Sequence, residues 1–480
     1  MKRYFLSLRV VLLASLLVGS SCNKFVDIKP DDNIPVANYY KTEADFRAAL
    51  TGSYANLRGI YNNYYLYSEL PADNARTFGE SEGSQGPFDK LTWTPITPQI
   101  SGAWNDAYRT TALANIILAR IEPVPFANPA TKTQYIGEAK FLRALMYFNL
   151  VRYFGDVPLV LTEVTSEQDA YKYNRSPAAD VYAQIEKDLL DAEAALPVTY
   201  AAAADKGRAT KGAAQALLGK VYLQQKKWPE AEAQLAQVVT ANTYQILPDI
   251  ANVFGLGKDN NAEIVFAAQY VATGFGEGNS FVHNFVPQPS GTSITSVTSN
   301  STCVGTQDLY NAFEPGDVRR DAFLGIYIGT ETYYWAKKFI YRVTLQNEGE
   351  NDWPILRYAD VLLMYAEALN NNGKTALAIP QLNRIRTRAG LAAKPLTLSS
   401  ADTQLAIEQE RRVELCFEGQ RWYDLIRWDK EVSTMQAFKT KYLPLDRATV
   451  NLNPRPEARL LPIPSREVAL NPNLKQNPGY

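Results

Sequence analysis

Histidine and cysteine are scarce in this sequence, with one histidine and three cysteines in 480 residues. Metals such as zinc need clustered His, Cys and carboxylate ligands at short spacings, and no such set is present. A Gly-rich phosphate loop ending in Lys-Ser or Lys-Thr is also missing. We therefore expect no metal and no cofactor. The spacing of Cys303 and Cys416 does not support a disulfide, and we interpret Cys416 as a small apolar core residue.

An excess of charge of either sign is lacking too. The chain carries 49 Lys and Arg against 50 Asp and Glu, a formal net charge of −1. Proteins that bind nucleic acid present a basic patch or a strongly basic domain. The composition therefore gives no electrostatic reason to expect nucleic acid as a partner.

Long apolar runs are absent except at the N-terminus, where a basic start precedes "VVLLASLLV" at 10–18. Nine residues fall short of the roughly 20 that span a bilayer, so this pattern predicts a signal peptide over 1–21. Gly19 and Ser21 suit an ordinary signal peptidase. Cys22 at the following position suits the bacterial lipoprotein pathway, although Gly19 stands where that pathway usually has Leu. We predict lipidation at Cys22.

Helical spacing of apolar residues covers much of the chain before residue 240. Apolar residues recur at i, i+3, i+4 and i+7, which is typical of amphipathic helices. The spacing predicts helices over 42–61, 101–122, 132–154 and 177–196. Thr42 and Asp45 can cap the start of the first. Residues 69–99 are aperiodic and contain Pro, Gly and Ser throughout, so they predict a long loop. Loops of that length are usually functional.

Two later segments match the tetratricopeptide pattern. In "LLGKVYLQQKKWPEAEAQLAQVV", the small residues Gly219 and Ala231 would let two helices approach closely. "YAEALNNNGKTALAIPQLNRI" repeats this logic with Ala366 and Ala378. The spacing between the units is irregular, which indicates a helical-repeat scaffold with large insertions.

Residues 241–345 depart from the helical pattern. "EIVFAAQYV" and "FLGIYI" are strand-like, and 273–306 are rich in Gly, Ser, Thr and Asn. We therefore predict a mostly α protein, in which a tetratricopeptide-like helical-repeat scaffold carries an inserted, irregular and partly β lobe. The expected parts are an N-terminal region at 22–240, the lobe at 241–345, and C-terminal repeat helices with an extended tail at 346–480.

A charged stretch at 408–428, "EQERRVELCFEGQRWYDLIRW", has the residue types of an acid/base or sugar-binding site. Glu410, Glu414 and Glu418 lie four apart, and arginines follow at spacings where helical side chains touch. Gly419 indicates a break in the helix. Charged residues after the break are expected to fold back on the glutamates: Arg421, Asp424 and Arg427. We interpret the stretch as a paired ionic network that braces the last repeat pair against the C-terminal tail.

Several motifs occur in a fixed order along the chain. They are "DFRAALTGSY", "PADNA" (71–75), "EAKFLRALMYFNLVRYFGDVPLV" (138–160), "GRATKGAAQALLGKVYL" (207–223), "LRYADVLLMYAEALN" (356–370), "ERRVELCFEGQRWYDLIRW" (410–428) and "LPIP…NPNLKQNPGY". Together with the Cys22 start, they resemble the SusD/RagB family, the nutrient-binding lipoproteins of Bacteroidota glycan-uptake systems. The resemblance covers nearly all of the chain.

The resemblance implies a mostly helical protein with four tetratricopeptide-like pairs and a more irregular binding lobe. It implies a lipid-anchored place on the outer membrane, facing the cell exterior, as a lid on a SusC-like TonB-dependent transporter. The ligand would be an oligosaccharide, or in some branches a peptide, bound without catalysis. A tetratricopeptide scaffold that holds other proteins is a separate alternative.

The resemblance also implies an aromatic binding arc, formed partly by the loop after the first helix, which matches 71–99 here. Candidates in this loop are Asn74, Arg76 and Trp93. A sugar C–H face stacks on an indole, while Arg and Asn donate to hydroxyls. The alternative is that Trp93 packs the loop onto the scaffold.

The rest of the arc would come from the lobe, where Phe275, Phe281, His283 and Phe285 lie in Gly- and Ser-rich sequence. Of these, we take Phe275, His283 and Phe285 as substrate-binding candidates. "TYYWAKK" at 332–338 has three adjacent aromatic residues, which are better explained as a strand with alternate burial.

One catalytic motif is present but is rejected. "GESEG" fits the G-x-S-x-G nucleophile pattern at Ser81, which works only at a sharp strand-to-helix turn with a His and an acid nearby. The flanking "NARTF" and "SQGPF" are not a buried strand and a helix, and His283 is the sole histidine. We therefore expect no catalytic residues and no hydrolase activity.

Overall fold

The computed structural model describes residues 39–78, 83–329, 331–441 and 451–480. The predicted signal peptide, Cys22 and Ser81 lie outside these ranges. Within them, no helix is both long and apolar enough to cross a membrane. Helices dominate and strands are few and short, which confirms the predicted mostly α class.

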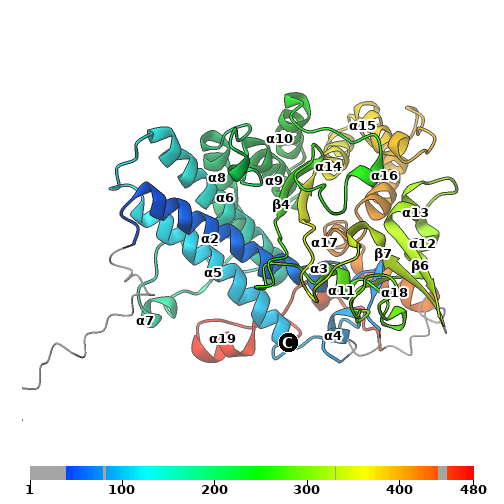
Figure 1. Cartoon of the computed structure of the whole chain (residues 1–480), viewed down its shortest axis with the longest axis horizontal. Helices are drawn as coiled ribbons and strands as arrows, with labels where there is room; N and C mark the ends of the chain where they lie inside the picture. Colours follow the sequence, from blue (N-terminus) through cyan, green and yellow to red (C-terminus); the bar gives the residue numbers. More distant parts are fainter. Residues whose placement is uncertain (1–38, 79–82, 330, 442–450) are drawn as a thin grey trace, which may run out of the picture.

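The long helices stack into a layered scaffold that fills the left and top of Figure 1. They are α2 (Glu43–Asn62), α5 (Pro98–Arg120), α6 (Pro129–Phe154), α8 (Ala178–Ala195), α9 (Lys211–Gln224), α10 (Trp228–Ala241), α14 (Tyr358–Asn371), α15 (Thr375–Arg388) and α16 (Ser400–Glu414). α6 packs against α5 and α8, and α9 packs against α8 and α10. α10 contacts α14, which in turn packs on α15 and α16, so neighbouring layers continue along the chain.

Local sequence signals explain where these helices begin and end. α2 starts at a capping box, in which the Thr42 side chain accepts the N–H of Asp45 and the Asp45 carboxylate accepts the N–H of Thr42 at 2.9 Å. This confirms the predicted start. α6 ends at Gly155, whose φ of +71° is a backbone conformation that glycine adopts at little cost.

The two segments with the tetratricopeptide pattern each form a helical hairpin, α9 with α10 and α14 with α15. A Cβ atom on Gly219 would lie 2.6 Å from Leu235 Cγ, so only glycine permits this approach. The predicted close contact at Gly219 is thereby confirmed. That the hairpins belong to a tetratricopeptide-like repeat stays a prediction.

In Figure 1, β6 (Leu324–Ile328) and β7 (Thr332–Ala336) lie at the opposite end of the molecule from α7 (Glu167–Ala170), and β4 (Ile264–Ala268) lies nearer the middle. All strands of the described residues are short. They are β1 (Ala75–Arg76), β2 (Val157–Pro158), β3 (Arg175–Ser176), β4 (Ile264–Ala268), β5 (Val304–Gly305), β6 (Leu324–Ile328), β7 (Thr332–Ala336) and β8 (Trp353–Arg357). One antiparallel sheet has the order β1-β5-β7-β6, and two-stranded sheets join β2 to β3 and β4 to β8. The strands predicted within 241–345 are confirmed as β4 and β6.

Short helices complete the fold. They are α3 (Tyr65–Ser68), α4 (Gly86–Asp89), α11 (Phe281–Asn284), α12 (Gln307–Ala312), α13 (Arg319–Phe323), α17 (Arg421–Arg427), α18 (Glu431–Lys441) and α19 (Ser465–Leu470), with single 3-10 turns at Ala203–Asp205, Ile250–Asn252, Gln288–Ser290, Lys337–Phe339 and Pro456–Arg459. The extended tail predicted after the charged stretch is corrected at α18. Met435 and Phe438 lie three residues apart and are both buried, so packing holds this segment in a helix.

A continuous apolar core runs from the helices into the lobe, with Phe285, Trp353 and Cys416 among its members. Cys303 and Cys416 are buried free thiols, which confirms the interpretation of Cys416 as a core residue. The boundaries at residues 240 and 345 stay predictions, because the lobe shares its core with the scaffold.

Candidate binding surface

The charged stretch 408–428 forms the end of α16, a turn and α17. Gly419 in the turn has a φ of +73°, and a Cβ atom there would lie 2.4 Å from the Tyr64 ring. The predicted break at Gly419 is thus confirmed, and both its backbone angle and its close contact require glycine.

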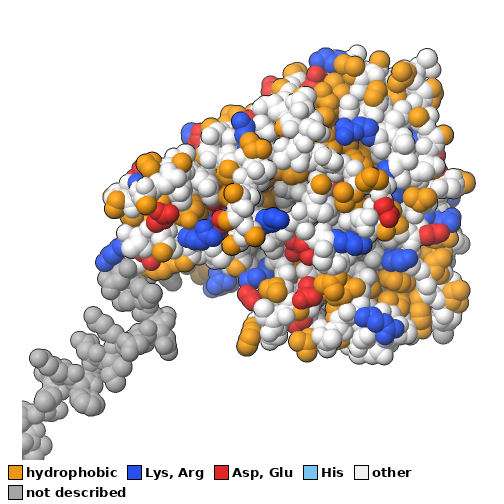
Figure 2. Space-filling view, turned by 45° about the horizontal axis from the view of Figure 1, so that its top comes forward, with side chains coloured by type: hydrophobic (Ala, Val, Ile, Leu, Met, Phe, Trp, Pro, Cys, Tyr) orange, Lys and Arg blue, Asp and Glu red, His pale blue; other side chains and the backbone are white. Residues whose placement is uncertain are grey.

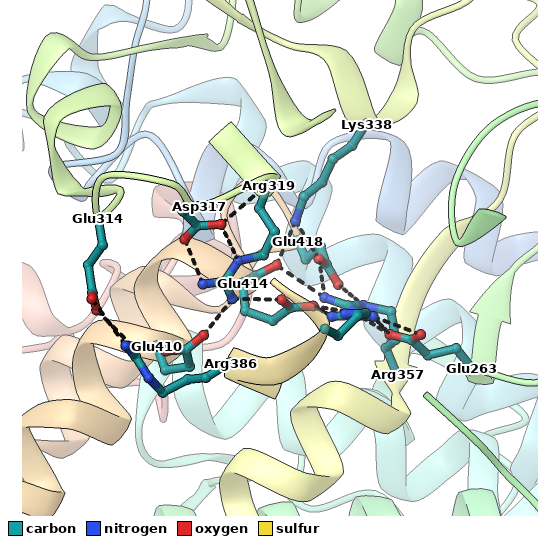
Figure 3. Close-up of polar contacts among 11 residues, drawn as sticks. Glu263, Glu314, Asp317, Arg319, Lys338, Arg357, Arg386, Glu410, Glu414 and Glu418 are labelled. Atoms are coloured by element: carbon teal, nitrogen blue, oxygen red, sulfur yellow. Dashed lines mark hydrogen bonds and ion pairs between the residues drawn. The ribbon is translucent and has the colours of Figure 1, made fainter. Parts of the chain in front are cut away.

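The glutamates of this stretch are buried among basic side chains from distant segments (Figure 3). Glu414 contacts Arg319 at 2.9 Å, Arg357 at 2.7 Å and Arg388. Burial alone would raise the pKa of Glu414, but the three guanidinium groups outweigh burial and hold this pKa well below its usual value. Ion pairs also join Glu410 to Arg319 and Arg386, and Glu418 to Arg357 and Lys338. This cluster stabilises the fold because buried charges need such partners.

The expectation that the charged residues after Gly419 fold back on these glutamates is wrong, because the arginines among them pair with other acids. Arg421 pairs with Asp73, and Arg427 pairs with Glu367 of α14 at 2.5 Å. Of the short-range pairs expected, Asp424 and Arg427 are in contact at 2.8 Å. The network therefore ties the end of α16 and α17 to the loop at Asp73 and to α14, where buried acids need a counter-charge.

The loop predicted to bind ligand is attached to the charged stretch at Asp73. Its carboxylate accepts from Arg421 at 2.8 and 2.9 Å and contacts Arg412 at 3.0 Å. Burial would raise the pKa of Asp73, but Arg412 and Arg421 lower it well below its usual value. Arg412 also donates to Asn74 at 3.0 Å, and β1 follows at once, paired with β5. The stretch that resembles an active site thus positions the loop.

Four of the six predicted binding residues are buried, which corrects the expectation that they face a ligand. Their exposed fractions are 0% for Asn74, 3% for Arg76, 1% for Trp93 and 0% for Phe285. A ring or guanidinium group enclosed by the core does not stack on a sugar in solvent. These residues hold the loop and the lobe against the scaffold.

Trp93 shows the reason most clearly. Its ring packs against Phe88, with 5.8 Å between centroids, and its indole N–H donates to the Tyr480 hydroxyl at 2.6 Å. Arg76 likewise forms a buried ion pair with Asp89 at 2.6 Å. The alternative given for Trp93, that it packs the loop onto the scaffold, describes its position in the structure.

The other two candidates remain accessible. Phe275 is 90% exposed on a turn between two glycines. His283 is half-buried and contacts the Thr298 carbonyl oxygen and the Gln346 amide, and burial lowers its pKa. A ligand contact at Phe275 or His283 stays a prediction.

Half-buried aromatic rings gather on the β6–β7 hairpin and on the loop residue that follows β1. We define the aromatic surface as Phe78, Tyr327, Tyr333 and Trp335. Tyr327 pairs with Tyr333 and Gly325 with Trp335, which places these rings on one face of the hairpin. Tyr333 lies 5.8 Å from Phe78 and 6.3 Å from Tyr327, centroid to centroid. Each of the four residues is intermediate between buried and exposed.

Neighbouring atoms hold these rings in place. A Cβ atom on Gly325 would lie 2.0 Å from the Trp335 ring, so glycine lets the indole lie against the strand. The Tyr327 hydroxyl donates to the Pro289 carbonyl at 2.7 Å. Figure 2 shows hydrophobic side chains gathered at the right, the end of the molecule that carries β6 and β7. Fixed rings with one open side suit the C–H faces of sugar rings.

Sequence reasoning passed over this surface, although the signal was present. "TYYWA" contains the aromatics of β7, and "LGIYI" places Tyr327 two residues after the small Gly325. The strand interpretation of "TYYWAKK" is confirmed by β7. The expected alternate burial is wrong, because all three aromatic residues of β7 are half-buried. β7 pairs with the edge strand β6, so both of its faces keep partly exposed rings.

A layered helical scaffold joined to small sheets is the SusD-like fold. The laminarin binding SusD-like protein shares it, with a TM-score of 0.78 and 29% identity over 92% of this chain and all of that one. NanU of B. fragilis has a TM-score of 0.78 at 27% identity, with 94% and 99% of the two chains covered.

Sequence comparisons agree with the structures. The family model described as "Starch-binding associating with outer membrane" matches residues 24–223, and the model "SusD family" matches 320–480. SusD-like protein P25 of Formosa agariphila is 27% identical over 96% of this chain and 97% of its own length. A SusD-like protein of Bacteroides ovatus is 28% identical over 89% and 83%. The chain belongs to the SusD/RagB family.

Proposed function

We propose that this protein is a non-catalytic, cell-surface glycan-binding lipoprotein. It captures an oligosaccharide at the aromatic surface and passes it to a SusC-like TonB-dependent transporter in the outer membrane. The lipid on Cys22 anchors it, facing the cell exterior. The observation that carries the proposal is the aromatic surface on β6 and β7, in a chain similar to a laminarin binding SusD-like protein.

The aromatic surface supports glycan capture through geometry as well as residue type. Tyr333 contacts both Phe78 and Tyr327, so three rings adjoin one another at different angles and can meet different faces of a bound sugar. The Tyr327 hydroxyl donates to Pro289 and keeps its oxygen free to accept from a sugar hydroxyl beside the stacked faces. A peptide with exposed rings would meet the same surface, and peptide binding is therefore an outcome of the test.

The test is isothermal titration calorimetry with laminarin, other plant, host and fungal oligosaccharides, and a mixed peptide pool. Tyr333→Ala is expected to lower the affinity for the best glycan at least tenfold, since a central aromatic contact contributes more than about 1.4 kcal/mol. Tyr310→Ala is the matched control, because Tyr310 stacks on Tyr334, whose ring faces the other side of the hairpin. Unchanged affinity in Tyr333→Ala, with a loss in Phe275→Ala or His283→Ala, would move the site to the lobe.

The partner and the anchor have tests of their own. Cys22→Ala should release the protein from the membrane fraction, because acylation would then be impossible. The adjacent reading frame should encode a large TonB-dependent barrel, and pull-down with the anchored protein should recover it. Recovery of unrelated proteins instead of a barrel would favour the protein-interaction scaffold.

A further inference from the structure

A pocket lies far from the aromatic surface. It has a volume of about 330 Å³ and lies between α5, the segment after β2, α7 and α19. In Figure 1, α7 and α19 lie at the left and bottom, while β6 and β7 lie at the right. The volume is at the lower end of the range for small-molecule pockets, about 300–1,000 Å³.

Aromatic side chains form two walls of this pocket. Tyr108 and Trp104 of α5 lie 4.9 Å apart, centroid to centroid. The Tyr108 hydroxyl donates to the Pro158 carbonyl at 2.8 Å, which fixes its ring. Across the pocket, Tyr171 follows α7 and is 36% exposed. The pocket therefore offers ring faces from two different elements.

Polar groups without protein partners line the same pocket. The Thr111 hydroxyl is buried, with the residue 1% exposed, and within the described part of the chain it makes no hydrogen bond. Glu467 of α19 is half-buried, and no hydrogen bond or ion pair joins its carboxylate to a described residue. Burial raises the pKa of Glu467. Polar groups removed from water normally have partners, so the Thr111 hydroxyl indicates a missing ligand, and the Glu467 carboxylate, which solvent still reaches, is open to the same ligand.

We propose that this pocket is a second saccharide site, which takes a neutral sugar unit or a disaccharide, separate from the aromatic surface. The sugar lies between Tyr108 and Tyr171, and Glu467 accepts from its hydroxyls. Arg109 and Asn105 line the pocket and supply donors. The ligand class rests on the proposed function. A neutral sugar fits because it brings hydroxyl donors for the carboxylate and C–H faces for the rings.

The experiment separates the pocket from the aromatic surface by weakening the aromatic surface first. Laminaribiose, cellobiose and maltose are titrated into the full-length Tyr333→Ala variant, in which the pocket is expected to supply most of the remaining binding. Ala112→Trp in this background should remove most of the remaining binding, because Ala112 is exposed on α5 and lines the pocket, so the indole fills it. Glu467→Gln should weaken the binding at least fivefold. Thermal unfolding of each variant checks that the fold is retained.

The outcomes separate the two proposals. The second site is overturned, while the aromatic surface stands, if the Tyr333→Ala variant binds no disaccharide. The same conclusion follows if the double variant Tyr333→Ala/Ala112→Trp binds disaccharide as well as Tyr333→Ala does. If the wild-type protein binds no saccharide of any kind, both proposals fall. Two sites would be established if the double variant Tyr333→Ala/Ala112→Trp loses the disaccharide binding of Tyr333→Ala while the single variant Ala112→Trp still binds laminarin.

Discussion

The charged stretch 408–428 and the aromatic surface on β6 and β7 are both built from residue types that occur in sugar-binding sites, but solvent reaches them differently. Glu414 is fully buried and contacts three arginines. Tyr333 is half-exposed among other rings. The difference follows from desolvation. Buried charges must be paired within the protein, whereas a Tyr ring can be packed on one side while its hydroxyl stays in water. A dense run of charge in a helix therefore indicates distant partners as readily as it indicates a ligand.

Removing one charge from the network tests whether the charged stretch stabilises the fold, and we expect this change to have the largest effect. Glu414→Gln leaves Arg319, Arg357 and Arg388 without their shared carboxylate and should lower the free energy of unfolding by roughly 3–5 kcal/mol. Chemical denaturation measures the change. Glu232→Gln is the matched control, because Glu232 pairs with the half-exposed Lys374 and should cost less than about 1 kcal/mol. Equal effects of the two variants would contradict the assignment of the cluster as structural.

The sequence predicted the parts of this fold that depend on neighbours along the chain. The capping box at Thr42, the break at Gly419 and the close helix contact at Gly219 each follow from local chemistry and are present. The partners of Arg421 and Trp93 did not follow, because Asp73 lies 348 residues and Tyr480 lies 387 residues away. Burial at such positions depends on which distant segments meet, and local patterns do not contain that information.

A substitution at Trp93 tests whether this residue packs against a distant segment or contacts the ligand. Trp93→Phe keeps an aromatic ring but removes the indole N–H that bonds Tyr480, so we expect a loss of about 1–2 kcal/mol in unfolding free energy. Glycan affinity should stay within twofold of the wild type, measured by calorimetry well below the melting temperature. Tyr480→Phe is the control, since it removes the same bond from the other side together with the donation of the Tyr480 hydroxyl to the Leu460 carbonyl at 2.8 Å, and it should lower stability at least as much. A fall in affinity in Trp93→Phe alone would restore Trp93 as a ligand contact.

The smallest expected effect concerns an acid outside the network. Asp352, next to β8, accepts the N–H of Tyr270 at 2.9 Å and lies near Asp259. Burial and the Asp259 charge raise its pKa to about 8. A carboxyl group whose pKa is raised on folding holds its proton more tightly in the folded state. Its stability contribution is therefore present below about pH 4 and is lost as pH rises to about 8.

Asp352→Asn removes this titration and keeps an oxygen for the Tyr270 N–H. Asp352 is half-buried, so solvent screens much of this shift, and we expect the variant to be about 1 kcal/mol more stable than the wild type at pH 8. It should show no gain at pH 4, and chemical denaturation at both pH values measures the difference. Asp73→Asn should behave in the opposite way, because Arg412 and Arg421 lower the pKa of Asp73 and its contribution is present at neutral pH. A gain for Asp73→Asn at pH 8 would mean that its arginines do not offset its burial. Opposite signs for the two substitutions would show that pairing with arginine, and not burial alone, decides which acids of this protein stabilise it.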